Sequence, residues 1–190
     1  LLRLKNPNKV TTVVEKSREL PNNQVVVNWG LEEVHTLKNL NINVPSPIEG
    51  KYKWSGQYKP YDHQKTTSAF LTMNRKAFCF NEQGTGKTAS AIWASDFLMT
   101  EGKIRRVLVI CPLSIMDSAW RNDLFSFAMH RKVDVAYGSA KKRKEIIAGD
   151  ADYVIINYDG VDIAMWTRFP CGFVARFDND REGRNRGRGR

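Results

Sequence analysis

The chain has 190 residues, 42% of them hydrophobic and 26% charged, so it holds enough apolar material for a core and is not disordered throughout. This length suits one domain of ordinary size with a small appendage. No apolar run approaches the roughly 20 residues that cross a bilayer, and no secretory signal opens the chain. The sequence therefore predicts a cytoplasmic protein without a membrane partner. Because it begins at Leu1 rather than Met, we also expect a trimmed or fragmentary chain.

Basic residues exceed acidic ones, 30 Lys and Arg against 20 Asp and Glu, and the net charge of +10 favours an anionic partner, nucleic acid above all. Residues 178–190 contain no apolar side chain and five arginines, and we expect them to form a disordered Arg/Gly tail. The three cysteines, Cys79, Cys111 and Cys171, lie far apart in apolar surroundings. That spacing indicates free thiols rather than a disulfide framework or a zinc site.

Residues 1–55 differ from the rest and predict a small N-terminal appendage with a linker. Two patches, 9–14 and 24–28, favour β-structure and are separated by Pro and Asn turn signals. A helix is expected after Gly30, because apolar residues follow at helical spacing. The Pro- and Gly-containing stretch 45–50 has the composition of a linker, which places the domain boundary near 50–57.

After this boundary, apolar strands alternate with amphipathic helices, and the pattern predicts a parallel sheet covered on both faces over residues 56–177. A Ser114 and Asp117 pair is expected to cap one of the helices, which would bury Trp120 and Leu124. The expected helices cover residues 62–73, 87–99, 114–124 and 139–148. The expected strands cover residues 77–80, 107–110, 133–136 and 153–156.

The segment 81–88, Asn-Glu-Gln-Gly-Thr-Gly-Lys-Thr, directly follows an expected strand and precedes a helix, as a phosphate-binding loop requires. Its glycines let backbone N–H groups point at phosphate oxygens, and the helix N-terminus adds its positive dipole. Lys87 would reach the β and γ phosphates and the Thr88 hydroxyl would ligate Mg²⁺, so ATP and Mg²⁺ are the expected cofactors. Asn81 stands where the common pattern has Gly; the alternative is a Gly-rich turn with an exposed Lys. The candidate nucleotide-binding residues are Gln83, Gly84, Thr85, Gly86, Lys87 and Thr88.

Gln64 lies 20 residues before Gly84, in the first turn of an expected helix. A Gln amide both donates and accepts hydrogen bonds, so it can pair with the edge of adenine and favour ATP over GTP. A Gln at such a position can also simply be solvated.

Four segments in order, 60–64, 81–88, 107–115 with Trp120, and 152–158, resemble the front half of the Swi/Snf-like DNA-dependent ATPases of helicase superfamily two. Compact versions of this family occur in bacteriophages, and residues 29–34 are similar to their leader region. The resemblance covers about residues 1–165. It implies an α/β fold, a RecA-like P-loop lobe with a parallel sheet and flanking helices, preceded by a small β-rich N-terminal segment. A phage origin would place the protein in the cytoplasm of a bacterial host.

The resemblance further implies a DNA translocase or helicase that holds the DNA backbone without reading its sequence. Pro112, Leu113, Ser114, Asn157 and Tyr158 match the family's backbone-contacting elements. The alternatives are a plain strand end that caps a helix, and ordinary loop residues. The basic run 141–144 would also suit DNA, although a charge run on a helix is more often a solvated face.

The chain departs from the family after residue 157, where an apolar strand ending in Asp-Glu-x-His is expected. Only residues 173–180 come near this pattern, with Asp178 and Asp180 at the end. The second lobe with its arginine finger is also missing, so the sequence reads as an incomplete lobe, truncated or frameshifted. Of the catalytic groups it supplies Lys87 and Thr88, and we expect ATP binding without useful turnover by this chain alone. A P-loop small-molecule kinase and a non-enzymatic, basic nucleic-acid-binding module are the competing interpretations.

Overall fold

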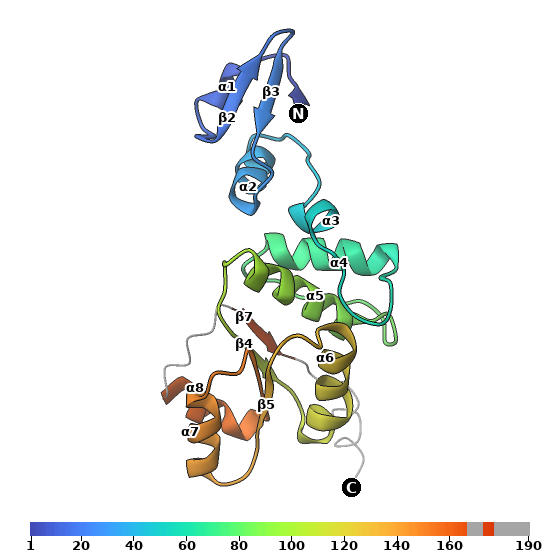
Figure 1. Cartoon of the computed structure of the whole chain (residues 1–190), viewed down its shortest axis with the longest axis vertical. Helices are drawn as coiled ribbons and strands as arrows, with labels where there is room; N and C mark the ends of the chain where they lie inside the picture. Colours follow the sequence, from blue (N-terminus) through green and yellow to red (C-terminus); the bar gives the residue numbers. More distant parts are fainter. Residues whose placement is uncertain (167–172, 177–190) are drawn as a thin grey trace, which may run out of the picture.

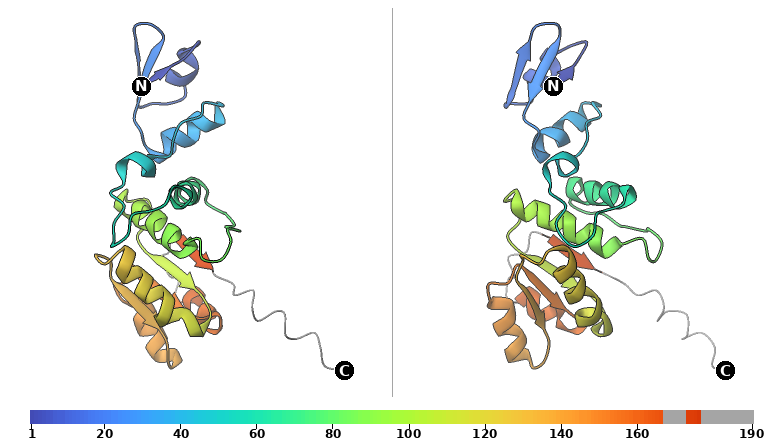
Figure 2. Two further views of the ribbon diagram at one scale, coloured as in Figure 1. Left: turned by 90° about the vertical axis from the view of Figure 1, so that its right-hand side faces the viewer. Right: turned by 45° about the vertical axis from the view of Figure 1, so that its right-hand side comes forward.

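The computed structural model describes residues 1–166 and 173–176. A small three-stranded sheet lies at one end of the molecule and a four-stranded sheet with its helices at the other (Figures 1 and 2). Between them lie α3 (Pro47–Lys51), α4 (Asp62–Met73) and α5 (Lys87–Thr100). None of the helices in the described residues is long and apolar enough to cross a membrane.

The N-terminal sheet is antiparallel, with the strand order β1 (Leu2–Arg3), β3 (Gln24–Val27), β2 (Ser17–Leu20). α1 (Asn8–Thr11) and α2 (Leu31–Asn39) complete this part of the molecule. Its core contains the buried side chains of Val10, Val14, Val25, Val34, Leu37 and Val44. The helix expected after Gly30 is therefore confirmed as α2.

One expectation for this part was wrong: residues 9–14 are not a strand. They contain most of α1 and the turn that follows it. Val10 and Val14 are both buried, but Thr12 between them is exposed. In a strand all three would lie on one face, whereas a helical turn brings residues four apart to one side without the residue midway between them. The β-branched composition of the segment favoured a strand, but burial against β3 and α2 decided the local structure.

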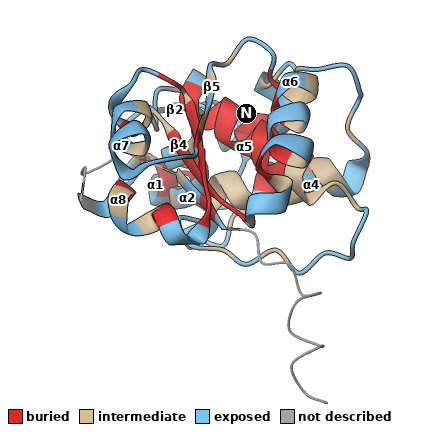
Figure 3. Ribbon diagram, turned by 90° about the horizontal axis from the view of Figure 1, so that it is seen from below, coloured by how far each residue is buried: buried red, intermediate tan, exposed pale blue. Residues whose placement is uncertain are grey.

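The larger sheet is parallel throughout, in the order β5 (Val133–Ala136), β6 (Tyr153–Ile156), β4 (Val107–Ile110), β7 (Phe173–Arg176). All residues of β4 and β6 are buried, as expected for central strands of a sheet with two covered faces. α7 (Ala140–Ala148) and α8 (Val161–Trp166) flank the sheet on the side opposite α5 and α6 (Asn122–Phe127) (Figure 3). The expected doubly covered α/β lobe is confirmed.

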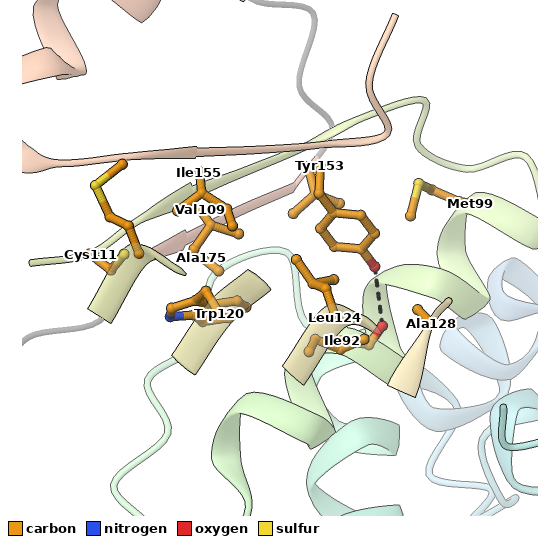
Figure 4. Packing of buried hydrophobic residues seen from close by; sticks show 12 residues of the cluster. Ile92, Met99, Val109, Cys111, Trp120, Leu124, Ala128, Tyr153, Ile155 and Ala175 are labelled. Atoms are coloured by element: carbon orange, nitrogen blue, oxygen red, sulfur yellow. Dashed lines mark hydrogen bonds between the residues drawn. The ribbon is translucent and has the colours of Figure 1, made fainter. Parts of the chain in front are cut away.

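Alternate residues of the central strands belong to two separate cores. Val109 and Ile155 face the core shared with α5 and α6, where the Tyr153 hydroxyl donates to the carbonyl of Ile92 at 3.4 Å (Figure 4). Leu108 and Val154 face the second core, on the side of α7 and α8. This period of two is the reason that both layers of helices are needed to cover the sheet.

The segment between β4 and β5 differs in detail from the single helix that the sequence predicts. It begins with a 3₁₀ turn (Leu113–Ile115), continues as one π-helical turn (Met116–Arg121) and ends in α6. Trp120 and Leu124 are buried as expected. A π-helical turn has hydrogen bonds from residue i to i+5 and therefore holds more residues per turn than an α-helix. Trp120, which lies in this turn, packs into the core between the helix and the sheet.

The expected strand at residues 77–80 is also wrong. These residues have no regular structure, and no described strand pairs with them. Phe78 and Phe80 are 83% and 90% exposed, with their rings stacked at a centroid distance of 5.9 Å. Alternation and apolar content favour a strand, but a strand forms only where a neighbouring strand supplies hydrogen bonds.

A buried carboxylate, Asp96, joins three separate parts of the lobe. Asp96 lies in α5 and is 1% exposed. Its Oδ1 accepts a hydrogen bond from Nε of Arg131 at 2.6 Å and lies 3.0 Å from Nε2 of His130. Its Oδ2 accepts from the hydroxyl groups of Tyr52 and Ser55. Burial and the neighbouring carboxylate hold the pKa of the Tyr52 hydroxyl above its usual range.

The chain segment before α4 is hydrogen-bonded to α5 and α6. The indole Nε1 of Trp93 donates to the carbonyl of Ser55 at 2.8 Å, and the amide of Gln57 donates to the carbonyl of Ser126 at 3.0 Å. A Cβ at Gly56 would come within 2.6 Å of that same carbonyl, and the φ of Gly56 is +110°. Residues 52–57 thus pack against α5 and α6, and the boundary near 50–57 stays a prediction.

The two cysteines in the described part of the chain should differ in reactivity. Cys111 is buried at the end of β4, and this burial raises the pKa of its thiol to about 11. Cys79 is partly exposed. Because the thiolate is the reactive form, iodoacetamide at pH 8 should modify Cys79 in the native protein and Cys111 only after unfolding. Peptide mass spectrometry distinguishes them, and equal rates would contradict the burial of Cys111.

Candidate nucleotide-binding site

The predicted phosphate-binding loop lies at the N-terminus of α5, as the sequence requires. Gly86 is the residue before the helix, with a φ of +78°, and Gly84 has a φ of +81°. Both values lie in the left-handed region that glycine adopts without steric cost. No atom lies within 4 Å of a Cβ placed on Gly84, so this glycine leaves open space at the loop. The loop thus has the backbone freedom that bound phosphate needs.

Lys87 is held across this loop by its own backbone. Its Nζ donates to the carbonyls of Asn81 at 2.7 Å and Glu82 at 2.8 Å. The Thr85 hydroxyl donates to the carbonyl of Glu82 at 2.8 Å, which closes the turn. The ammonium group of Lys87 is therefore held beside the first two residues of the loop. Thr88 follows Lys87 in the first turn of α5.

The first turn of α4 contacts the loop through Gln64. Its Nε2 donates to the carbonyl of Thr85 at 3.2 Å, and its Oε1 accepts from the amide of Tyr61 at 3.0 Å. A Cβ on Gly86 would lie 2.1 Å from that Nε2, so only glycine permits this approach. One N–H and one lone pair of the Gln64 amide stay available for a base, and the adenine role stays a prediction.

Two residues that contact the loop, His63 and Thr67, were not predicted from the sequence. His63 Nε2 lies 3.1 Å from the carbonyl of Thr85, and its ring stacks on Tyr61 at a centroid distance of 5.7 Å. Thr67, one turn further along α4, accepts a hydrogen bond from Nδ2 of Asn81 at 2.9 Å. Asn81 stands where the common pattern has Gly, and its amide fastens the start of the loop to α4. The helical spacing of His63, Gln64 and Thr67 was the available signal for a shared face.

The predicted DNA-contacting segments follow adjacent strands of the sheet. Pro112, Leu113 and Ser114 come after β4, and Leu113 and Ser114 are exposed. Asn157 and Tyr158 come after β6, which pairs with β4, so both segments lie at one edge of the sheet.

The two residues after β6 differ in exposure. Asn157 is 6% exposed, and its Nδ2 donates to Oδ2 of Asp159 at 3.2 Å. Its Oδ1 is buried without a hydrogen-bond partner. The Tyr158 ring is partly exposed and lies 5.6 Å from the Arg176 guanidinium. Tyr158 can therefore meet a ligand at the surface, whereas Asn157 is placed to support the turn.

The structure describes the basic run 141–144, but only part of the segment 173–180. Lys141, Lys142 and Lys144 are exposed on α7, which follows β5 and so begins at the same edge of the sheet. Residues 173–176 form β7 and pair with β4. Asp178, Asp180 and the predicted tail lie outside the described residues. Within the described residues, no group of three or more His, Cys, Asp or Glu could hold a metal ion. Thr88, the predicted Mg²⁺ ligand, lies in the first turn of α5.

Comparisons with known proteins agree with this arrangement. The fold is similar to the SWI2/SNF2 ATPase core of Sulfolobus solfataricus, solved in complex with double-stranded DNA, at 19% identity and a TM-score of 0.53 over 69% of this chain and 34% of that one. It is also similar to the UvsW helicase of bacteriophage T4, at 13% identity and a TM-score of 0.51 over 94% of this chain and 88% of that one. The chain thus spans about a third of the Sulfolobus protein.

No curated protein matches this sequence. A family profile described as the SNF2-related domain matches residues 22–180, which is most of the chain and includes both the predicted phosphate-binding loop and the parallel sheet. The chain belongs to the SNF2-related domain family, as the motifs of its sequence predicted.

Proposed function

We propose that the chain is the ATP-binding lobe of a DNA-dependent ATPase that translocates along DNA or unwinds it. The observation that carries this proposal is the loop at the N-terminus of α5, where Gly84 and Gly86 have left-handed backbone angles. The Lys87 ammonium donates to a carbonyl at the start of this loop, and the Gln64 amide donates to the carbonyl of Thr85 within it. Membership of the SNF2-related family supports ATP as the nucleotide and DNA as the polymer.

The residues of the loop have separate roles in this proposal. Backbone N–H groups of residues 83–88 and the dipole of α5 hold the phosphates, and the Lys87 ammonium exchanges its two backbone carbonyls for phosphate oxygens. Gln64 orients the adenine with the polar groups of its amide that the protein leaves available. The residues present fit Mg²⁺ in part, because Thr88 offers a hydroxyl in the first turn of α5. When bound, Mg²⁺ neutralises charge on the transferred phosphoryl group.

DNA is proposed to lie across the carboxyl ends of the neighbouring parallel strands β4 and β6. Backbone amides and hydroxyls at such an edge bind phosphate without reading bases. Exposed Ser114 supplies a hydroxyl, partly exposed Tyr158 supplies a ring with a hydroxyl, and exposed lysines of α7 add positive charge. The whole protein would pair this lobe with a second one that supplies the arginine finger.

DNA binding by the chain tests this interface. Replacing Ser114 by Ala should lower the affinity for duplex DNA about 3–10-fold, as expected for loss of one hydrogen bond to a phosphate. The salt dependence should stay unchanged, because a hydroxyl releases no counterion. The measurement is fluorescence anisotropy with labelled duplex at several salt concentrations.

Ser126→Ala is the matched control, because Ser126 lies on α6 and its hydroxyl donates only to the carbonyl of Asn122 within the helix. Equal losses in both variants would remove the proposed interface. Wild-type protein that binds no DNA at low salt would contradict the DNA-dependent function itself.

A further inference from the structure

The N-terminal sheet has one face against its helices and one face toward solvent. Val25 of β3 is buried in the core that α1 and α2 complete, and Leu2 and Val27 pack against the same core. Residues directly opposite each other in an antiparallel pair point to the same face, so the register defines the second face as well. The five residues of this outer face are Arg3, Arg18, Leu20, Gln24 and Val26.

The outer face carries positive charge without a compensating carboxylate. Arg3, Arg18 and Val26 are exposed, and Leu20 and Gln24 are partly exposed. Neither arginine forms an ion pair in the part of the chain that the structure describes. Two guanidinium groups on a polar face are complementary to an anionic partner, whereas an uncharged apolar face would favour burial against another protein.

The neighbouring acidic residue of β2 does not reduce this charge on the outer face. Glu19 aligns with Val25 and therefore belongs to the opposite side of the sheet. Because side chains alternate along a strand, Glu19 and Arg18 point in opposite directions. The outer face thus combines two cations with an amide and two aliphatic side chains, and it contains no anion.

The spacing of the two arginines selects among anionic partners. Arg3 is opposite Gln24 and Arg18 is opposite Val26, on the two outer strands that flank β3. Two strand spacings and a shift of two residues place their Cα atoms about 12 Å apart. The major groove of B-form DNA is also about 12 Å wide, and a group of β-strands can enter it. The two guanidinium groups can therefore reach phosphates on opposite sides of such a groove.

We propose that the outer face of the N-terminal sheet binds duplex DNA across its major groove. Arg3 and Arg18 hold phosphates of the two strands that border the groove, while Gln24 and Val26 on β3 face the base edges. The N-terminal sheet and the larger sheet lie at opposite ends of the molecule, so this contact is separate from the one proposed at β4 and β6 (Figures 1 and 2). The choice of DNA as the anionic partner rests on the proposed function.

DNA binding by the whole chain tests the outer face, with fluorescence anisotropy of labelled duplex at several salt concentrations. The double variant Arg3→Gln, Arg18→Gln should bind duplex about 10–100-fold more weakly at low salt. The slope of log affinity against log salt should become shallower by about 2, one for each phosphate contact that is lost. Single-stranded DNA of the same length should lose less affinity, because it has no groove bordered by two strands.

Two further double variants make this result specific. Lys9→Gln, Lys38→Gln removes the same charge from exposed positions on α1 and α2, behind the sheet, and should leave the affinity for duplex nearly unchanged. Arg3→Lys, Arg18→Lys keeps both charges and should keep most of the salt dependence, since an ammonium also binds phosphate. Circular dichroism should show wild-type folding for all three, because the substituted side chains are exposed.

The outcomes separate this inference from the proposed function. Wild-type protein that binds no duplex would overturn both together. Duplex binding that Ser114→Ala weakens and Arg3→Gln, Arg18→Gln leaves unchanged would overturn this inference alone. Equal losses in the Lys9→Gln, Lys38→Gln control would reduce the effect to net charge, and equal losses for duplex and single strands would remove the groove. Poly-glutamate that binds the wild type but not the arginine variant, with duplex binding unchanged, would identify an acidic protein as the partner instead.

Discussion

Replacing Asp96 by Ala should lower the free energy of unfolding by about 3–5 kcal/mol, because removal of one member of a buried ion pair leaves the other members without compensation. Nε of Arg131 would lose its carboxylate acceptor, and the hydroxyl of Tyr52 would lose its carboxylate partner. The midpoint of thermal unfolding should fall by roughly 6–20 °C, which circular dichroism or calorimetry would measure.

Two further variants make this result specific. Asp96→Asn keeps an acceptor oxygen and the shape of the side chain, so it should lose less stability than Asp96→Ala. Asp62→Ala removes an exposed carboxylate paired with Lys65 on the surface, and its melting temperature should match the wild type. If Asp96→Ala melted with the wild type, the network between residues 52–57, α5 and residues 130–131 would contribute nothing to the fold.

The second large effect is expected at Lys87. Lys87→Ala should weaken ATP binding about 10–100-fold, or roughly 1.4–2.7 kcal/mol, since the ammonium forms charge-assisted hydrogen bonds with phosphate. Stability should be nearly unchanged, because Lys87 contacts only two carbonyls of its own loop. Titration of a fluorescent ATP analogue measures the affinity.

Lys53→Ala is the control for this variant. Lys53 is an exposed lysine before α4 and carries the same charge, so a general electrostatic effect would weaken both variants alike. Equal binding by Lys87→Ala and wild type would remove the phosphate-binding interpretation of residues 81–88. A loss of binding accompanied by unfolding would instead show that the loop supports α5.

Sequence alone determined the elements whose signals are local. The central strands β4 and β6 are continuous apolar runs, and the helices α4 and α5 begin at clear start signals. The turn before α5 was predictable because Gly84 and Gly86 can adopt the left-handed region without steric cost, and both have a positive φ in the structure. The family followed from the order of four motifs, and the profile match agrees.

Only the tertiary structure decided the elements whose local preference is weak or depends on a partner. Residues 9–14 form a helical turn because Val10 and Val14 pack into one core, and residues 77–80 are not a strand because no strand in the described part of the chain pairs with them. The polar contacts of His63 and Asp96 are with residues that lie 22 and 44 positions away in the chain. Periodicity and propensity report on the chain's own neighbourhood, whereas pairing of strands and burial of polar groups depend on which distant segments arrive beside them.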